Sequence, residues 1–248
     1  MAILKIKNLQ KHFGGVMAID GLSVSFEKAR VTSVIGPNGS GKTTLVNVLS
    51  AMLNADSGII TISNGPDLRK CAPFTAHFYG ITRTFQEVRL FEQMSVLDNV
   101  LIVLTERNVL SAIFEKHGAY HLQQAKTALE TTGLWSKRIE LATNLSYGQR
   151  KLLEVARVLA LTASGKSNII LFDEPFAGLF PQMVKTVADI IKELRMAGKT
   201  IVLIEHNMDL IRELSDHLIV MDAGKLLAQG EPEEVLSRKD VIEAYLGE

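Results

Sequence analysis

The stretch from residue 36 to residue 44 constrains the fold of this chain most, because it fits the pattern G-x-x-x-x-G-K-S/T without a gap. An apolar run, Val31–Ile35, precedes it, and a helix-compatible run, 44–53, follows it. This is the strand–loop–helix context that the pattern requires. Glycines let backbone N–H groups point inward at a phosphate, and a helix N-terminus adds its dipole. The sequence therefore predicts a nucleotide-binding loop made of Gly36, Pro37, Asn38, Gly39, Ser40, Gly41, Lys42, Thr43 and Thr44.

Two side chains of this loop have chemistry suited to a nucleotide. Lys42 can neutralise the β- and γ-phosphates, and the hydroxyl of Thr43 can hold Mg²⁺. The alternative is a glycine-rich turn that binds nothing. The flanking strand and helix favour the nucleotide site over that alternative.

Composition narrows the class of protein further. Lys plus Arg and Asp plus Glu number 27 each, so no global basic field indicates nucleic acid as a partner. The single cysteine, Cys71, excludes an internal disulfide and suits a reducing compartment. No apolar run approaches the ~20 residues needed to span a bilayer, and the N-terminus alternates like a strand rather than a signal peptide. We expect an intracellular protein.

The order of the elements predicts an α/β fold. An edge strand is expected at 3–9, a turn carrying Phe13 at 11–15, and further strands at 22–26, 31–35 and 58–62. Helices dominate about 73–143, including 96–104 with Ser95 as cap and 120–132 ended by Gly133. Strands and helices then alternate, which implies a mostly parallel sheet with helices on its faces. The predicted elements there are a helix at 147–161, strands at 168–172 and 200–204, helices from 181 and at 208–214, a hairpin at 218–229, and helices at 233–236 and 241–246.

Two acids follow an apolar strand later in the chain. Asp173 and Glu174 come after the run at 168–172, and a parallel strand delivers such residues at its C-terminal end, where α/β sheets place ligands. Asp173 would orient Mg²⁺ through its water shell, and Glu174 would polarise the water that attacks the γ-phosphate. The alternative is a pair of solvated acids at a strand end. The phosphate loop upstream favours the catalytic interpretation.

The sequence Leu145-Ser146-Tyr147-Gly148-Gln149 carries a family resemblance. It resembles the LSGGQ signature of ABC-type ATPases, with Tyr147 in place of the first glycine. Ser146 at a helix N-terminus with Gly148 beside it makes an end that can bind an anion, although an ordinary capped helix would look the same. The resemblance implies that Ser146, Gly148 and Gln149 close over the ATP of a second subunit, so that hydrolysis requires a dimer.

Three further positions match the same family. Phe13 stands where an aromatic residue stacks on adenine, Gln86 matches the Q-loop glutamine that reaches Mg²⁺ and the attacking water, and His206 matches the histidine that contacts the γ-phosphate. Phe180 departs from the family, which usually has Asp or Asn at that position of the D-loop. The resemblance implies ATP and Mg²⁺ as cofactors, with Glu174, His206, Gln86 and Lys42 in catalysis.

The resemblance also implies an architecture. The chain, 1–248, would be a single ABC ATPase domain with a P-loop NTPase core of mostly parallel sheet and N-terminal antiparallel strands. The core would comprise about 1–86 and 162–235, with a helical subdomain at about 87–161 and a C-terminal helical tail at about 236–248.

Two stretches, 83–91 and 240–247, are similar to the branched-chain amino acid importers. This similarity implies an ATPase subunit on the cytoplasmic face of the membrane, with transmembrane permease subunits, a second ATPase subunit (identical or not) and, indirectly, a periplasmic or extracellular solute-binding protein. Residues 173–178 also resemble the lipopolysaccharide-export ATPase. Two rival interpretations are a soluble ABC ATPase acting on nucleic acid or ribosomes, and a regulatory module that binds ATP without hydrolysing it. The neutral net charge does not favour nucleic acid.

Overall fold

The computed structural model describes residues 1–63, 67–68, 76–85, 87–105, 119–165 and 167–246. Cys71 and Gln86 lie outside this set. The chain forms two compact units: unit 1 is Met1–Arg83, Asn168–Glu174 and Ile191–Glu248, and unit 2 is Thr84–Ser167 and Pro175–Ile190. The expected helical subdomain, about 87–161, falls in unit 2, and unit 2 also contains 175–190.

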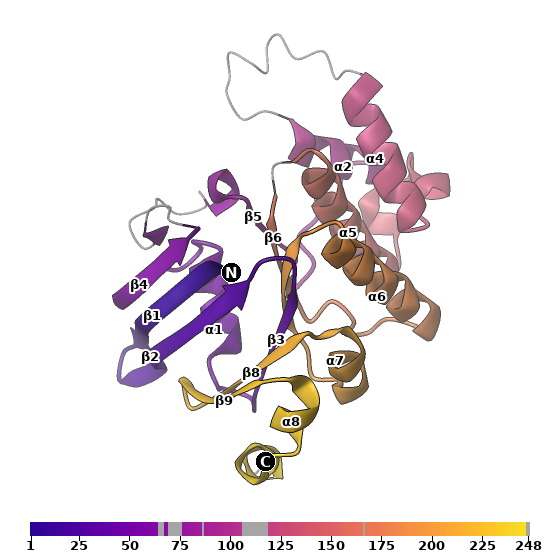
Figure 1. Ribbon diagram of the computed structural model, residues 1–248. Coiled ribbons are helices and arrows are strands. Elements are labelled where there is room, and N and C mark those ends of the chain that lie inside the picture. Colours follow the sequence, from indigo (N-terminus) through magenta and orange to yellow (C-terminus); the bar gives the residue numbers. More distant parts are fainter. Residues whose placement is uncertain (64–66, 69–75, 86, 106–118, 166, 247–248) are drawn as a thin grey trace. The chain divides into compact units, whose positions relative to one another are not determined.

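Unit 1 contains a small antiparallel sheet at its N-terminal end (Figure 1). Leu4 and Ile6 are buried along its first strand while Lys5 and Lys7 are exposed, as alternation predicts. A shift of register between Ile6 and Leu9 then brings Leu9 to the buried face. The prediction of an edge strand was wrong, because a later strand returns to pair with the free side of the first strand. The expected turn from residue 11 is also displaced, since the strand continues to Phe13. The order is β2-β1-β4, with β2 at Val16–Glu27, β1 at Ala2–Phe13 and β4 at Ser57–Ile62.

A second, six-stranded sheet carries the strands that lead to the predicted site residues. Its strands are parallel except for the last, β9, which forms the predicted hairpin with β8. The strands β3, β6 and β7 are buried at every position, which explains their mostly apolar sequences. The order is β5-β6-β7-β3-β8-β9, with β5 at Ile81–Arg83, β6 at Ile169–Asp173, β7 at Thr200–Ile204, β3 at Val31–Ile35, β8 at His217–Asp222 and β9 at Lys225–Gly230.

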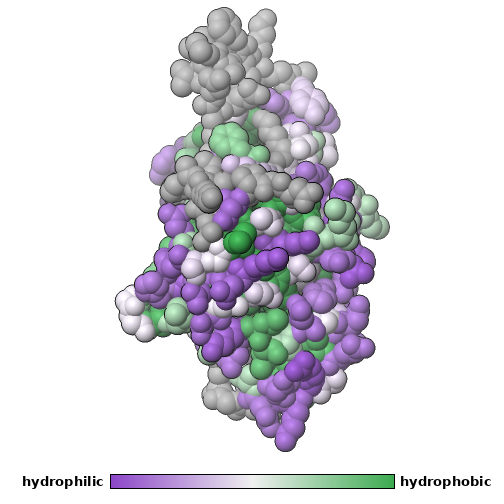
Figure 2. All heavy atoms as spheres, turned by 60° about the vertical axis from the view of Figure 1, so that its left-hand side comes forward, coloured by the Kyte–Doolittle hydropathy of each residue, from purple (hydrophilic) through white to green (hydrophobic). Residues whose placement is uncertain are grey.

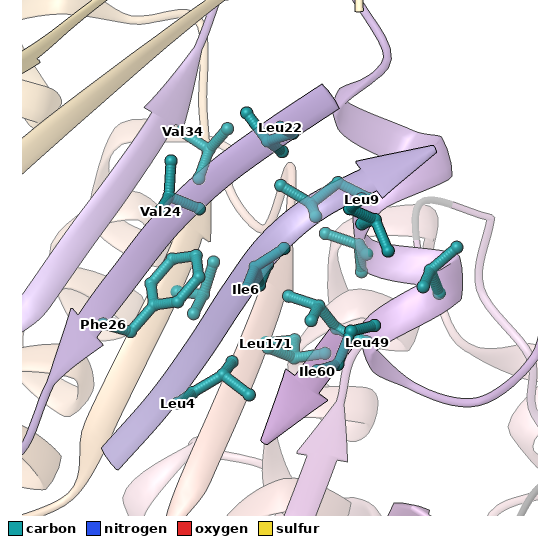
Figure 3. Packing of buried hydrophobic residues seen from close by; sticks show 14 of the residues in the cluster. Leu4, Ile6, Leu9, Leu22, Val24, Phe26, Val34, Leu49, Ile60 and Leu171 are labelled. Atoms are coloured by element: carbon teal, nitrogen blue, oxygen red, sulfur yellow. The ribbon is translucent and has the colours of Figure 1, made fainter. Parts of the chain in front are cut away.

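Helix α1 (Lys42–Leu49) joins the two sheets of unit 1 into one hydrophobic core. Leu45 and Leu49 of α1 belong to the same buried cluster as Leu4 and Phe26 of the small sheet and Leu171 of the large sheet (Figure 3). The helix that follows the phosphate loop is thus fixed in place by packing from both sheets.

The remaining helices of unit 1 precede, connect or follow strands of the large sheet. Helix α7 (Met208–Leu214) begins after Asn207, whose side chain caps it by accepting hydrogen bonds from two backbone N–H groups of the first turn. Helices α8 (Pro232–Leu236) and α9 (Lys239–Leu246) end the described chain and pack on β8 and β9 through a second apolar cluster. A 3₁₀ turn, η2 (Ala76–Tyr79), precedes β5.

Unit 2 is helical in its described part, as the sequence predicts for the middle of the chain. Ser95 caps α2 through a hydrogen bond from the Asp98 N–H, and Gly133 follows α4 with a left-handed φ of 72°. Ser146 caps α5, which runs two residues beyond its predicted end at 161. The elements are α2 (Val96–Leu104), α4 (Ala119–Thr131), η3 (Trp135–Lys137), η4 (Ala142–Asn144), α5 (Tyr147–Ala163) and α6 (Pro181–Met196), the last of which passes from unit 2 into unit 1.

Figure 2 shows a face on which hydrophilic side chains predominate and apolar side chains form small areas between them. Across the part of the chain that the structure describes, no helix combines the length and the apolar character needed to cross a membrane.

The core of unit 1 makes a testable prediction about stability. Phe26 is fully buried in the apolar cluster to which the small sheet, α1 and the large sheet contribute. Truncating it to Ala removes its contacts and leaves a cavity, so Phe26→Ala should lower the free energy of unfolding by about 3–5 kcal/mol. Chemical unfolding followed by circular dichroism measures this. The matched control is Phe78→Ala, because Phe78 is 74% exposed and its loss should change stability by less than about 0.5 kcal/mol. Equal effects of the two substitutions would contradict the assignment of the core.

Candidate functional site

The phosphate loop lies between β3 and α1, where the chain passes very close to two other strands. A Cβ atom at Gly36 would lie 2.0 Å from the carbonyl oxygen of Met221, and one at Gly41 would lie 2.3 Å from that of Ala18. Both glycines also have left-handed φ angles, 149° and 98°. Only glycine fits at these two positions, so the loop keeps a curled path with its backbone close to β2 and β8.

Lys42 lies inside this curl. Its Nζ donates hydrogen bonds to the carbonyl oxygens of Gly36 at 2.7 Å and Pro37 at 2.8 Å, and approaches Ser40 Oγ at 3.3 Å. The side chain is buried, whereas Asn38, Gly39 and Thr43 are exposed around it. The structure therefore places a positive charge at the centre of the loop and the hydroxyl of Thr43 on the first, solvent-facing turn of α1.

Asp173 and His206 come to the same edge of the large sheet because β6 and β7 are parallel neighbours. Asp173 is paired in register with Ile204, and Glu174 continues the pairing with a backbone N–H donated to the Ile204 carbonyl at 3.0 Å. The Glu174 side chain reaches His206, with Oε1 and Nε2 3.1 Å apart. The structure thus brings together the two residues that the sequence separates by a helix and a strand.

The backbone of Glu174 has an unusual conformation. Its φ is 47°, in the left-handed region that residues other than glycine rarely adopt. Such conformations cost free energy and cluster at functional sites, where the surrounding structure holds them. The turn points the Glu174 carboxylate at His206 and leaves the preceding Asp173 buried.

Glu205 and Asn207 fix the backbone on either side of His206. The carboxylate Oε1 of Glu205 accepts hydrogen bonds from the N–H groups of His206 at 2.8 Å and Asn207 at 3.1 Å. Asn207 in turn caps α7. This double restraint positions His206, and the sequence did not reveal the part that Glu205 takes in it.

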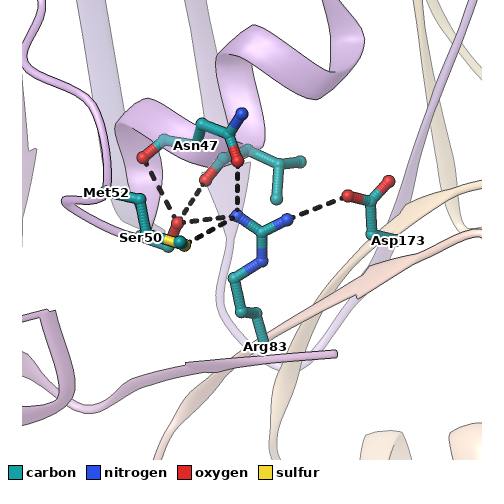
Figure 4. Close-up of polar contacts among 6 residues, drawn as sticks. Asn47, Ser50, Met52, Arg83 and Asp173 are labelled. Atoms are coloured by element: carbon teal, nitrogen blue, oxygen red, sulfur yellow. Dashed lines mark hydrogen bonds and ion pairs between the residues drawn. The ribbon is translucent and has the colours of Figure 1, made fainter. Parts of the chain in front are cut away.

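Asp173 is paired with a residue whose role the sequence also did not reveal. The Nη2 of Arg83, at the end of β5, donates to Asp173 Oδ2 at 2.9 Å (Figure 4). The exposed fractions of the two side chains are 7% for Arg83 and 1% for Asp173, so the ion pair is buried. The sequence analysis expected helices to dominate about 73–143 and did not predict the strand β5, which pairs with β6, so the position of Arg83 beside Asp173 was not foreseen.

Phe13 ends β1 at the tight turn Gly14-Gly15 and is 50% exposed. Lys11 lies over its ring with Nζ 5.4 Å from the ring centre. The Asp56 carboxylate lies 2.8 Å from Lys11 Nζ and 2.7 Å from His12 Nδ1. The hydrogen bond from Lys11 keeps the pKa of Asp56 below its usual value. The exposed ring of Phe13 therefore lies at a strand end that these contacts hold in place. Phe13 belongs to the β1–β2 hairpin, whose Ala18 carbonyl touches the phosphate loop.

In unit 2, Ser146 and Gln149 form a complete capping box at the start of α5. Ser146 Oγ accepts from the Gln149 N–H at 3.3 Å, and Gln149 Oε1 accepts from the Ser146 N–H at 3.0 Å. Gly148 lies against the Met183 side chain, since an added Cβ would lie 2.7 Å from Met183 Sδ and would displace it. The first backbone N–H groups of a helix have no partner within the helix, so this end suits an anion.

The two departures from the family pattern lie on the same part of unit 2. The ring of Tyr147 covers Gly178, where an added Cβ would lie 2.8 Å from Tyr147 Cε1. Phe180, two residues further on, is 73% exposed. An aromatic surface therefore stands where the family usually presents a polar side chain at the D-loop.

The segment that follows Gln86 is held to α5. Glu154 Oε1 accepts from the Arg89 N–H at 2.9 Å, and Arg157 donates to the Arg89 carbonyl at 2.6 Å. Burial raises the pKa of Glu154. Gln86 itself lies outside the described residues, so its role stays a prediction.

The comparisons with known proteins agree with this geometry. The sequence model of the ABC transporter family matches residues 19–177, and that of the branched-chain amino acid ATP-binding cassette transporters matches residues 225–248. The high-affinity branched-chain amino acid transport ATP-binding protein BraF of Pseudomonas aeruginosa is 35% identical, with 99% of this chain and 98% of the relative covered. The probable branched-chain amino acid transport ATP-binding protein LivG of Methanocaldococcus jannaschii is 38% identical, with 100% and 98% covered.

Solved structures give the same result. A nucleotide-free ATP-binding cassette from an ABC transporter matches with a TM-score of 0.86 and 36% identity, and 100% of each chain is covered. The ADP conformation of another such cassette matches with a TM-score of 0.84 and 38% identity over 100% of each chain. The predicted α/β P-loop NTPase fold and the resemblance to branched-chain amino acid importers are thereby confirmed. The chain belongs to the ABC transporter family, among the ATP-binding subunits of branched-chain amino acid transporters, and is an ATPase that binds nucleotide.

Proposed function

We propose that this chain powers the import of branched-chain amino acids or related small polar solutes by hydrolysing ATP at the cytoplasmic face of a membrane. The observation that carries the proposal is the match of residues 225–248 to the branched-chain amino acid cassette family, together with relatives of that name along the whole chain. The partners in this proposal are transmembrane permease subunits, a second ATPase subunit and, indirectly, an extracytoplasmic solute-binding protein.

The site has features that suit both the phosphates and the adenine base of ATP. The curled loop, held by glycines at 36 and 41, presents backbone N–H groups and the Lys42 charge to phosphates. The exposed ring of Phe13 offers a face for adenine to stack on. These features support a nucleotide site in unit 1 made of Phe13 and residues 36–44.

Unit 1 also offers oxygen atoms that suit Mg²⁺. Thr43 offers a hydroxyl and Asp173 a buried carboxylate, which are the hard ligands that Mg²⁺ prefers. Among the residues that the structure describes, no group of three or more His, Cys, Asp or Glu side chains is arranged to hold a metal ion. Mg²⁺ commonly uses only one or two protein ligands, with phosphates and water completing its shell. When bound, Mg²⁺ would neutralise charge on the phosphates.

Glu174 would act as the general base of hydrolysis. Its carboxylate takes the proton of the water whose oxygen attacks the γ-phosphorus, and ADP leaves with the electrons of the broken P–O bond. His206 orients Glu174 through the 3.1 Å contact and contacts the γ-phosphate, while Lys42 stabilises the charge that develops on the phosphoryl oxygens. The capped end of α5, with Ser146, Gly148 and Gln149, would complete the nucleotide site of a second ATPase subunit.

The role of Lys42 leads to a prediction about binding. Lys42→Ala removes the positive charge from the centre of the loop, and the loss of charge-assisted hydrogen bonds should weaken ATP affinity at least about tenfold. Titration of a fluorescent ATP analogue measures this. The control is Lys5→Ala, which removes an exposed lysine on β1 of the same unit and should leave affinity unchanged. Unaltered ATP binding in Lys42→Ala would refute the role of Lys42.

The role of Glu174 leads to a prediction about turnover. Glu174→Gln keeps the shape of the side chain but removes the base, so ATP hydrolysis should fall by about 10²–10⁴-fold while ATP binding is retained. Phosphate release and nucleotide binding are measured on the same preparation. Glu27→Gln, at the exposed end of β2, is the matched control. Near-normal hydrolysis in Glu174→Gln would remove Glu174 from the role of base.

The transport function is tested through the partners. Tagged Glu174→Gln protein, with ATP and Mg²⁺, is used to pull down partners from detergent-solubilised native membranes. We expect polytopic membrane proteins and a second, different ATPase to co-purify. Membrane partners with this ATPase alone would instead favour a homodimeric transporter, of which the lipopolysaccharide-export type is one. Nucleic acid or ribosomes in place of membrane proteins would contradict transport.

A further inference from the structure

Arg83 occupies a central position among the polar residues of unit 1. It is the last residue of β5, and β5 pairs with β6 in parallel, so that Arg83 is in register with Leu171, two residues before Asp173. Its side chain is 7% exposed. Figure 4 shows the guanidinium between the end of α1 on one side and Asp173 on the other.

One side of the guanidinium is held by the C-terminal end of α1. Nη1 donates to Asn47 Oδ1 at 2.8 Å and to Ser50 Oγ at 2.9 Å. The Ser50 hydroxyl donates its own proton to the Val46 carbonyl at 2.8 Å, so its oxygen faces Arg83 as an acceptor. A cation at a helix C-terminus also interacts favourably with the helix dipole. These contacts fix the plane of the guanidinium.

The other side of the guanidinium holds Asp173. Nη2 donates to Asp173 Oδ2 at 2.9 Å, and the carboxylate is 1% exposed. Because the attraction within a buried ion pair is largely offset by desolvation, such a pair contributes little net stability. Its physical effect is geometric: the planar, forked guanidinium sets the direction of the carboxylate.

Helix α1 therefore connects the two protein groups suited to Mg²⁺, the Thr43 hydroxyl and the Asp173 carboxylate. The helix begins at Lys42, with Thr43 in its first turn, and its last turn holds Arg83, which holds Asp173. Both sheets of unit 1 pack on α1, so the helix is a fixed reference for both groups.

We propose that Arg83 is a positioning residue for ATP hydrolysis, which fixes the Asp173 carboxylate relative to the phosphate loop through Asn47 and Ser50. This inference rests on the proposed role of Asp173 at Mg²⁺. Partners that orient a metal ligand in this way typically change metal affinity about 10–100-fold when they are altered.

The test measures metal binding and is independent of activity. Mn²⁺ serves as the probe, and its affinity for the protein–ADP complex is determined from the electron paramagnetic resonance signal of free Mn²⁺. Arg83→Lys keeps the charge but loses the fork, so Mn²⁺ affinity should fall about 10–100-fold. Metal-free ADP binding should be unchanged. Arg212→Lys, on the exposed side of α7 in the same unit, is the matched control and should have no effect.

A second variant separates positioning from folding. The double substitution Asn47→Ala and Ser50→Ala leaves the Arg83–Asp173 pair but removes its anchors on α1, and Mn²⁺ affinity should fall in the same direction by a smaller factor. Wild-type Mn²⁺ affinity in this double variant overturns the proposal, as does wild-type affinity in folded Arg83→Lys. If Arg83→Lys does not fold, as judged by circular dichroism, the double variant alone decides.

Asp173→Asn distinguishes this inference from the function on which it rests. Weakened Mn²⁺ binding in Asp173→Asn, together with normal binding in the Arg83 and α1 variants, would refute only the positioning role of Arg83. Normal binding in Asp173→Asn would refute the metal role of Asp173, and the inference about Arg83 with it.

Discussion

The close approach of the phosphate loop to two neighbouring strands is the constraint on which the site depends. The backbone at Gly36 touches the Met221 carbonyl of β8, and the backbone at Gly41 touches the Ala18 carbonyl of β2. These contacts tie the loop to both sheets of unit 1, because β8 belongs to the large sheet and β2 to the small one. The Lys42 ammonium then fills the curl that the glycines permit.

The parallel pairing of β6 and β7 positions the other residues of the site. Because β6 and β7 run side by side, the residues that follow them, Glu174 and His206, are brought within contact of one another. The carboxyl ends of parallel strands form the edge at which α/β proteins bind ligands. Helix α1 connects this edge to the loop, since Arg83 bridges its last turn to Asp173. The rigidity of the site comes from the core that α1 shares with both sheets.

Local signals in the sequence predicted the fold well. The caps Ser95 and Ser146 fall where the helices begin, because a cap is determined by the few residues around it. The partner of β1 on its free side could not be predicted, since β4 pairs with it across more than 40 intervening residues, as in Lys7↔Ile59. Sequence spacing alone does not specify such a pairing.

In the candidate site, too, local sequence patterns were predicted and long-range contacts were not. Motif residues of the phosphate loop and the strand ends were identified from sequence, because their chemistry depends on short, contiguous patterns. Arg83, Asp56 and Glu205 were not assigned roles, although each contacts a motif residue or its immediate neighbour. Arg83 and Asp56 act across the tertiary fold, and the contribution of Glu205 depends on the direction of its side chain after a strand. A sequence read one segment at a time reveals none of these.

The left-handed backbone of Glu174 has a consequence for the evolution of the chain. Glycine adopts that conformation without the steric cost that a Cβ imposes, so the fold taken alone would favour glycine at this position. Glutamate occupies this position despite a conformational cost of about 1–3 kcal/mol. Under the proposed role of Glu174 as general base, a lineage that lost the need for turnover would gain stability by replacing this residue with glycine, and glycine at position 174 would be an early mark of a cassette that has ceased to hydrolyse ATP.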